Sequence, residues 1–135
     1  MMDKSVAAPS PREYVTAFQE IGPLTAAQMR MLRIHYHAPE SRITATQLAS
    51  ELGYGHYAFA NRLYGALSRL MGEKLGYRPD PVYMGTMVLF EKRSGKWHWI
   101  MRPEVAEALE ALGWVDGADP VSARGDRLAD GLARG

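Results

Sequence analysis

The stretch of sequence that most constrains the fold reads as two helices joined by a glycine turn. Thr44 and Gln47 have the spacing of a capping box, in which each side chain accepts a hydrogen bond from the other residue's backbone amide. Gly53 ends this short helix, because glycine readily adopts the left-handed conformation of a helix C-terminus. A longer helix is expected over residues 57–75, with Gly76 as its stop. The pattern therefore predicts a short helix, a tight turn and a long helix.

Two earlier helices begin with the same chemistry. Ser10 starts a helix expected over residues 11–21, and Thr25 starts one that ends near His37. In each case a Glu or Gln three residues after the cap completes a capping box. We expect the buried stripe of the second helix to be Met29, Leu32, Tyr36 and the stem of Arg33.

Beyond Gly76 the sequence changes from helical to strand patterning. Residues 84–92 are rich in β-formers, and residues 96–101 alternate, with a tight turn at 93–95 between them. This predicts a β-hairpin. Trp97 and Trp99 fall on one face of it, so we expect both rings in the core, with stacking on nucleic-acid bases as the alternative.

The ends of the chain complete the predicted organisation. Residues 103–112 are expected to form a further helix, with a last short strand at 114–115. The first ten residues (1–10) read as a disordered N-terminus, and residues 116–135 as a flexible or weakly helical tail. The folded domain is therefore expected over residues 11–115.

Composition excludes several classes of protein. The chain has 135 residues and no cysteine, which excludes disulfides, thiolate nucleophiles and zinc sites built on cysteine. No apolar run approaches the roughly 20 residues that span a bilayer, and the N-terminus has no signal-peptide pattern. We therefore expect a cytoplasmic protein with no membrane partner.

Enzyme motifs are missing from the sequence. His35 and His37 fall at a helix end without carboxylate support, which makes a zinc site there a poor interpretation. The sequence has no glycine-rich phosphate loop and no nucleophile elbow. We expect neither catalysis nor a cofactor.

Charge is unevenly distributed along a chain of net charge +1. Residues 53–102 carry eight basic and three acidic residues, a net charge of +5, whereas the rest of the chain has a net charge of −4. Such asymmetry favours a polyanionic partner. The alternative is a chance clustering of solvated charges.

The long helix 57–75 has a distinctive small and basic side. On a helical wheel its apolar positions, Ala60, Leu63, Leu67, Leu70 and Met71, lie together. The opposite side holds Ala58, Asn61, Arg62, Gly65, Ser68, Arg69 and Gly72. Interior glycine costs about 1 kcal/mol relative to alanine, so a close approach by another backbone is expected to compensate. That backbone is either DNA or another helix of the same protein.

The residue types on this side and around it suit contacts with DNA. Asparagine matches the edge of adenine and arginine that of guanine, while serine, histidine and backbone amides hold phosphate. The alternatives are that the tyrosines pin the turn to the core and that the arginines are solvated. The candidate DNA-binding residues are Tyr54, His56, Tyr57, Asn61, Arg62, Gly65, Ser68, Arg69 and, at the hairpin tip, Lys92, Arg93 and Lys96.

Together these elements predict an α+β, mostly α, winged helix-turn-helix with four N-terminal helices, a β-hairpin wing and one further helix. The helix 57–75 is expected in the major groove of double-stranded DNA, with the tip 92–96 on phosphate. Such a protein would be a regulator or the DNA-reading part of a defence system. The alternative is a protein-interaction or dimerisation module that uses the same small-residue helix face.

The segment 43–76 also resembles winged-helix accessory domains of bacterial HNH-type, modification-dependent restriction endonucleases. Residues 101–104 and 112–114 look similar as well. The resemblance implies a DNA-binding accessory domain that senses modified bases. The chain lacks the His-Asn-His nuclease module, so cleavage is not implied. The matching residues of the segment are Leu52, Gly53, Tyr54, Tyr57, Asn61, Tyr64, Gly65, Leu67, Arg69 and Leu70.

Overall fold

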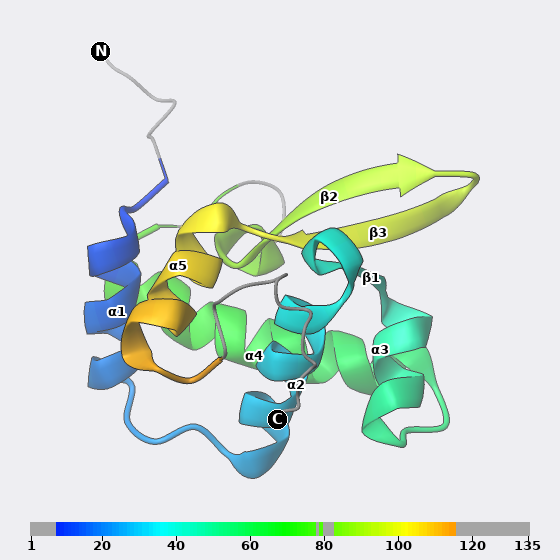
Figure 1. Ribbon diagram of the computed structural model, residues 1–135, viewed down its shortest axis with the longest axis horizontal. Coiled ribbons are helices and arrows are strands. Elements are labelled where there is room, and N and C mark those ends of the chain that lie inside the picture. Colours follow the sequence, from blue (N-terminus) through cyan, green and yellow to red (C-terminus); the bar gives the residue numbers. More distant parts are fainter. Residues whose placement is uncertain (1–7, 78, 80–82, 116–135) are drawn as a thin grey trace, which may run out of the picture.

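The computed structural model describes residues 8–77, 79 and 83–115, and these form a mostly helical α+β fold (Figure 1). Five α-helices and a three-stranded antiparallel sheet make up this part of the chain. The helices are α1 (Pro11–Glu20), α2 (Ala26–His37), α3 (Ala45–Leu52), α4 (Tyr57–Leu75) and α5 (Pro103–Leu112), with short 3₁₀ turns η1 (Pro39–Ser41) and η2 (Tyr83–Thr86). The strands are β1 (Arg42–Thr44), β2 (Val88–Arg93) and β3 (Lys96–Met101).

The helix boundaries follow from the capping chemistry. The three predicted capping boxes, at Ser10, Thr25 and Thr44, are confirmed, each with reciprocal side-chain hydrogen bonds. Gly53 and Gly76 adopt the left-handed conformation that ends α3 and α4, with φ of 85° and 66°. The predicted positions of the helices are therefore confirmed to within a residue or two.

The sheet contains one strand that the sequence did not predict. Its order is β1-β3-β2, and β1 pairs Ile43 with Trp99 of β3. A three-residue strand is too short for an alternating pattern, and its partner lies more than fifty residues away, so local patterning carries no signal for it. The predicted hairpin is confirmed, although its turn is limited to Ser94 and Gly95.

Other predictions at the ends of elements are wrong. Residues 84–86 belong to a 3₁₀ turn rather than to a strand. Trp114 lies in a bend rather than a strand, with its ring edge-on to Phe18 at 5.3 Å. Of the N-terminus 1–10, which was expected to be disordered, the structure describes only residues 8–10, and Pro9 among them is buried. Residues 1–7 and the predicted tail 116–135 lie outside the described residues.

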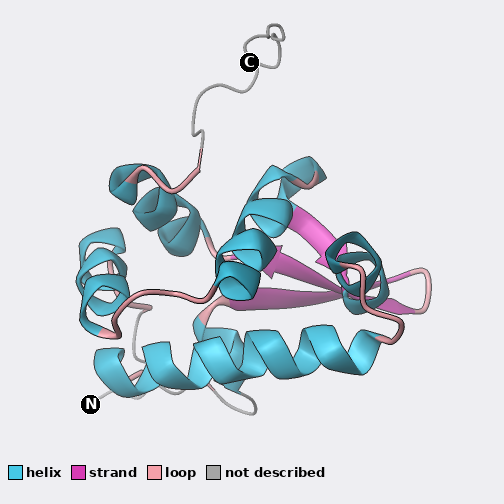
Figure 2. Ribbon diagram, turned by 90° about the horizontal axis from the view of Figure 1, so that it is seen from below, coloured by secondary structure: helices cyan, strands magenta, loops and turns pink. Residues whose placement is uncertain are grey.

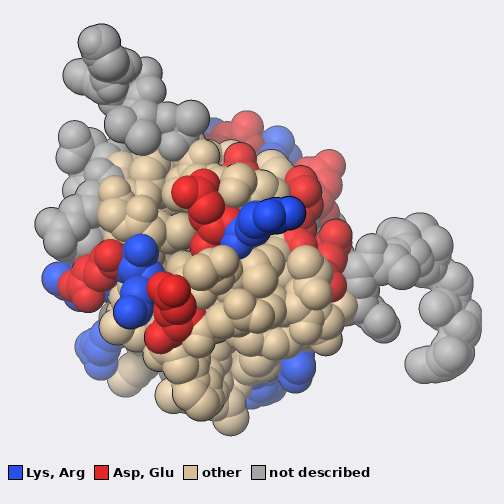
Figure 3. All heavy atoms as spheres, turned by 90° about the vertical axis from the view of Figure 1, so that its left-hand side faces the viewer, with Lys and Arg blue, Asp and Glu red and all other residues tan. Residues whose placement is uncertain are grey.

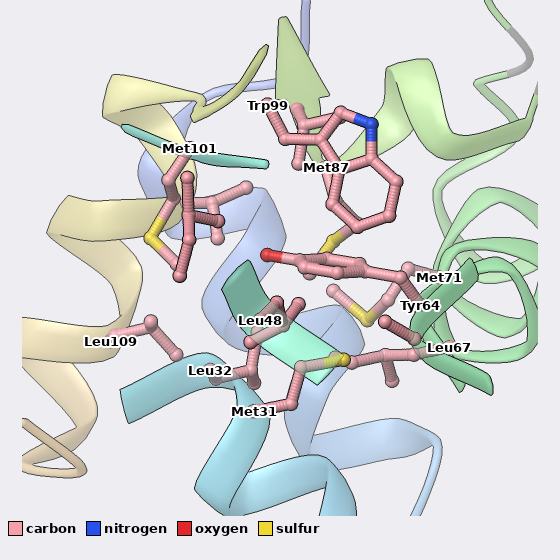
Figure 4. Close-up of a cluster of buried hydrophobic side chains, with 14 of the residues drawn as sticks. Met31, Leu32, Leu48, Tyr64, Leu67, Met71, Met87, Trp99, Met101 and Leu109 are labelled. Atoms are coloured by element: carbon pink, nitrogen blue, oxygen red, sulfur yellow. The ribbon is translucent and has the colours of Figure 1, made fainter. Parts of the chain in front are cut away.

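The core forms where the five helices and the base of the hairpin meet, and Figure 4 shows a part of it. Met31 and Leu32 of α2 lie in this core together with Tyr64, Leu67 and Met71 of α4, and Met31 points toward Leu67 (Figure 4). The stripe predicted for α2 is therefore partly wrong: Leu32 is buried, but Met29 and Tyr36 are half-buried. The other two buried residues of α2 are Met31 and His35.

Candidate nucleic-acid interface

The buried face of α4 determines which of its residues can meet a partner. It differs from the predicted face by about a fifth of a turn. Leu67 is buried as predicted, but Leu63 is half-buried and Leu70 is 44% exposed. The observed face differs from the predicted one because it includes Tyr64, which is fully buried although its hydroxyl is polar. The buried residues of α4 are Ala60, Tyr64, Leu67, Ser68, Met71 and Gly72.

This rotation divides the predicted strip of small residues. Ser68 is fully buried and cannot reach DNA, so its assignment as a phosphate contact is wrong. Gly72 is buried as well, so internal packing accounts for that glycine. Gly65 is half-buried, and a Cβ added there would meet nothing within 4 Å. Of the two glycines, Gly65 alone leaves a notch on the surface of α4.

The exposed side of α4 retains most of its predicted polar residues. Asn61, Arg62 and Arg69 are all exposed. The Arg62 guanidinium lies over the ring of Phe59, with its Cζ 5.3 Å from the ring centroid. Phe59 is 47% exposed and was missed as a site residue, although its i, i+3 spacing from Arg62 places the two side chains together. The exposed side is therefore mixed, with aromatic, aliphatic and basic groups.

The α3–α4 turn presents its aromatic residues in different ways. His56 is the N-cap of α4, and its Nδ1 accepts a hydrogen bond from the Ala58 amide at 3.0 Å. Accepting at Nδ1 leaves the Nε2–H of this exposed imidazole as a donor. Tyr57 is exposed and its ring stacks on His56, whereas Tyr54 is half-buried and packs near Phe59. A depression of about 330 Å³ at the turn is lined by Thr46, Ala49, Ser50, Tyr54, Gly55, His56 and Tyr57.

The hairpin tip carries the three predicted cations, Lys92, Arg93 and Lys96, and all are exposed. One Nη of Arg93 lies 3.5 Å from the Glu91 carboxylate, which also pairs with Arg42. The hydrogen bond from Arg42 holds the pKa of Glu91 below its usual range, so this carboxylate stays charged. Arg93 is therefore partly neutralised, and Lys92 and Lys96 are the stronger candidates for phosphate.

The two tryptophans of β3 differ in burial. Trp99 is buried against Tyr64, with the ring centroids 5.6 Å apart, but Trp97 is 57% exposed. The expectation that both lie in the core is therefore wrong for Trp97. Trp99 is covered by Tyr64 of α4, whereas Trp97 lies further out, where the hairpin projects past the three-stranded part of the sheet.

The α3–α4 turn and the hairpin tip lie at the same end of the molecule (Figures 1 and 2). At the opposite end, around α1 and α5, acidic and basic side chains are interspersed (Figure 3). The basic residues of segment 53–102 do not all belong to one charged surface patch. Arg102 serves the fold, donating from Nε to the Gly85 carbonyl at 2.7 Å, and Arg78 lies outside the described residues.

The histidines of the described residues are not grouped as metal ligands. His35 is buried, and burial lowers its pKa to about 4. Among the described residues no group of three or more His, Cys, Asp or Glu side chains could hold a metal ion. None of the helices in the described ranges is long and apolar enough to cross a membrane.

Comparison with known proteins found no matching family model, no matching curated protein and no matching solved structure. The resemblance to winged-helix accessory domains therefore stays a prediction.

Proposed function

We propose that this chain binds double-stranded DNA as a winged helix-turn-helix protein. In this proposal α3 and α4 form the helix-turn-helix, α4 lies in the major groove, and the β2–β3 hairpin is the wing. The order β1, α3, α4, β2, β3 along the chain supports this, together with the sheet order β1-β3-β2. The major groove of B-DNA is wide enough to admit one α-helix.

The observation that carries the proposal is the exposed side of α4. Asn61 and Arg62 lie one turn into the helix, and Arg69 lies two turns further on. The notch at Gly65 lies between them, where a nucleic-acid backbone can approach closely. Asparagine and arginine are the side chains that read adenine and guanine by paired hydrogen bonds. These residues are therefore assigned to base contacts.

Phosphate contacts are assigned to the two ends of this surface. The N-terminus of α4 offers backbone amides and the exposed Nε2 of His56. At the wing, Lys92, Arg93 and Lys96 supply positive charge. Phosphate contacts position a protein on the duplex and make its affinity depend on salt.

Fluorescence anisotropy with a labelled duplex, measured at several salt concentrations, tests the proposal. We expect the logarithm of the binding constant to fall linearly with the logarithm of salt concentration, by about 0.9 per phosphate contact. A parallel series with a methylated duplex tests the sensing of modified bases that the resemblance implies. No measurable binding to any duplex at low salt would contradict DNA binding.

The second candidate function is a protein-interaction or dimerisation module. Phe59 and Leu70 favour it, because both are large apolar side chains exposed on α4, about three turns apart. Gel filtration with and without DNA separates the two functions. A tight oligomer that is insensitive to salt, with no shift on adding DNA, would favour the second. For either function, we propose that the protein is not an enzyme and that it acts in the cytoplasm, as a regulator or within a defence system.

A further inference from the structure

We infer that the projecting part of the hairpin binds unpaired bases of nucleic acid by stacking them on Trp97. This inference extends the proposed function, because it places a single-stranded segment beside the duplex held by α4. The stacking itself depends on the hairpin alone. It can therefore be tested separately from the contacts of α4.

The strand register brings the aromatic groups to one face of the hairpin. Lys92 pairs with Trp97 and Phe90 pairs with Trp99, and paired residues share a face of the sheet. Phe90 is 38% exposed and Trp97 57% exposed. The face that is buried around Trp99 therefore continues outward as an open aromatic surface.

The charges around this surface favour nucleic acid over a protein partner. The Lys92 ammonium lies 5.9 Å from the centroid of the Trp97 ring. A partner that covered the Trp97 ring would therefore also have to cover this charge. Lysine is depleted from the cores of protein–protein interfaces. Aromatic rings beside cations that follow a phosphate backbone are typical of sites for single-stranded nucleic acid.

Unpaired bases fit the surface better than paired ones. An aromatic side chain reaches the faces of paired bases only by unstacking the duplex, which costs free energy. The bases of an overhang or a fork are already accessible. Every base has a π-face, so the contact is expected to tolerate any sequence.

The test compares a labelled blunt duplex with the same duplex carrying a short oligo-dT overhang. We expect the wild-type chain to bind the overhang substrate more tightly, and Trp97→Ala to lose about 5- to 150-fold in affinity for it. Trp97→Phe, which keeps a ring, restores most of the preference. The matched control is Leu89→Ala, because Leu89 is an exposed apolar residue on the opposite face of the same hairpin, and it leaves the preference unchanged.

Salt and a second probe separate this inference from the proposed function. The loss caused by Trp97→Ala persists at high salt, because stacking is not ionic, while the contribution of Lys92 shrinks. Oligo-dT alone quenches the fluorescence of the wild-type chain more than that of Trp97→Phe, whatever happens to duplex binding. Equal affinity for the two substrates, or a full preference retained by a folded Trp97→Ala, would overturn the inference. So would a loss of self-association in Trp97→Ala without any effect on DNA.

Discussion

The hydroxyl of Tyr64 donates a hydrogen bond to Nδ1 of His35, with 2.7 Å between the two atoms, and both side chains are buried in the core. The other imidazole nitrogen, Nε2, lies 2.9 Å from the carbonyl oxygen of Trp99. A carbonyl only accepts, so Nε2 carries a proton. Because burial lowers the pKa of His35 to about 4, the ring is neutral at pH 7 and its Nδ1 accepts from Tyr64. Burial raises the pKa of Tyr64, which keeps its hydroxyl protonated as the donor. This network joins α2, α4 and β3, and it fixes the rotation of α4.

The rotation of α4 directs its candidate DNA-binding side outward. Arg62 lies two residues before Tyr64, about 200° around the helix, so burial of Tyr64 places Arg62 on the opposite side. The His35–Tyr64 hydrogen bond therefore links the stability of the core to the orientation of the proposed interface.

Stability is expected to fall on acidification because of His35. Its folded pKa is lowered to about 4, whereas an unperturbed imidazole has a pKa of 6.5. Between these values the unfolded chain binds a proton that the folded chain does not, so stability decreases as pH falls from about 6.5 to 4. The predicted loss is about 3 kcal/mol. Urea unfolding of the wild type and of His35→Gln over this range measures it, and equal slopes in the two would contradict the assignment.

Loss of the Tyr64 hydroxyl is expected to destabilise the fold. Tyr64→Phe leaves Nδ1 of His35 without its donor in the core, which costs about 1–3 kcal/mol. The matched control is Tyr57→Phe, which removes an exposed hydroxyl and should change stability by less than about 0.5 kcal/mol. Urea unfolding at neutral pH checks both variants. Equal stability of the two would mean that the buried hydrogen bond contributes nothing.

Local signals in the sequence predict the helices of this fold well. The Thr44–Gln47 capping box involves only four consecutive residues. The end of α3 likewise depends on one residue, Gly53, which adopts the left-handed conformation. The hairpin is similarly local. Its two turn residues, Ser94 and Gly95, both have positive φ, which matches the twist of the strands.

Non-local features of the fold and the site escape such signals. The strand β1 exists because of its pairing with β3, and Trp97 is exposed because the hairpin projects past the three-stranded part of the sheet. Tyr64 reads as amphipathic, and its burial depends on a partner, His35, on another helix. Consequently the position of α4 is predictable, but its rotation is not, and Ser68 was assigned to the wrong side.

The hairpin turn is expected to be sensitive to the residue at position 95. Gly95 has a φ of 77°, and a Cβ there would meet nothing within 4 Å, so any cost of Gly95→Ala is conformational. A left-handed alanine costs about 1–2 kcal/mol. Ser94→Asn is the control, because asparagine favours the first position of this turn. Thermal unfolding should rank Gly95→Ala lowest, and equal melting temperatures would exclude this role for the glycine.

The cations of the hairpin tip are expected to set part of the salt dependence of DNA binding. Replacing Lys92 or Lys96 by alanine should reduce the slope of log K against log salt by about 0.9 each. Arg93→Ala should have a smaller effect, because Glu91 partly neutralises Arg93. Anisotropy titrations at four salt concentrations measure these slopes. Slopes unchanged in all three variants would remove the hairpin tip from the interface.

The measurement that tests the account most directly is the DNA affinity of Arg62→Ala and Arg69→Ala beside that of Arg12→Ala. All three variants remove one exposed positive charge, but Arg12 lies on α1, away from the proposed interface. We predict that each α4 variant loses about 1–3 kcal/mol of binding free energy for duplex DNA, with Arg12→Ala close to the wild type. If all three variants bind duplex DNA as tightly as the wild type does, α4 is not the helix that enters the groove.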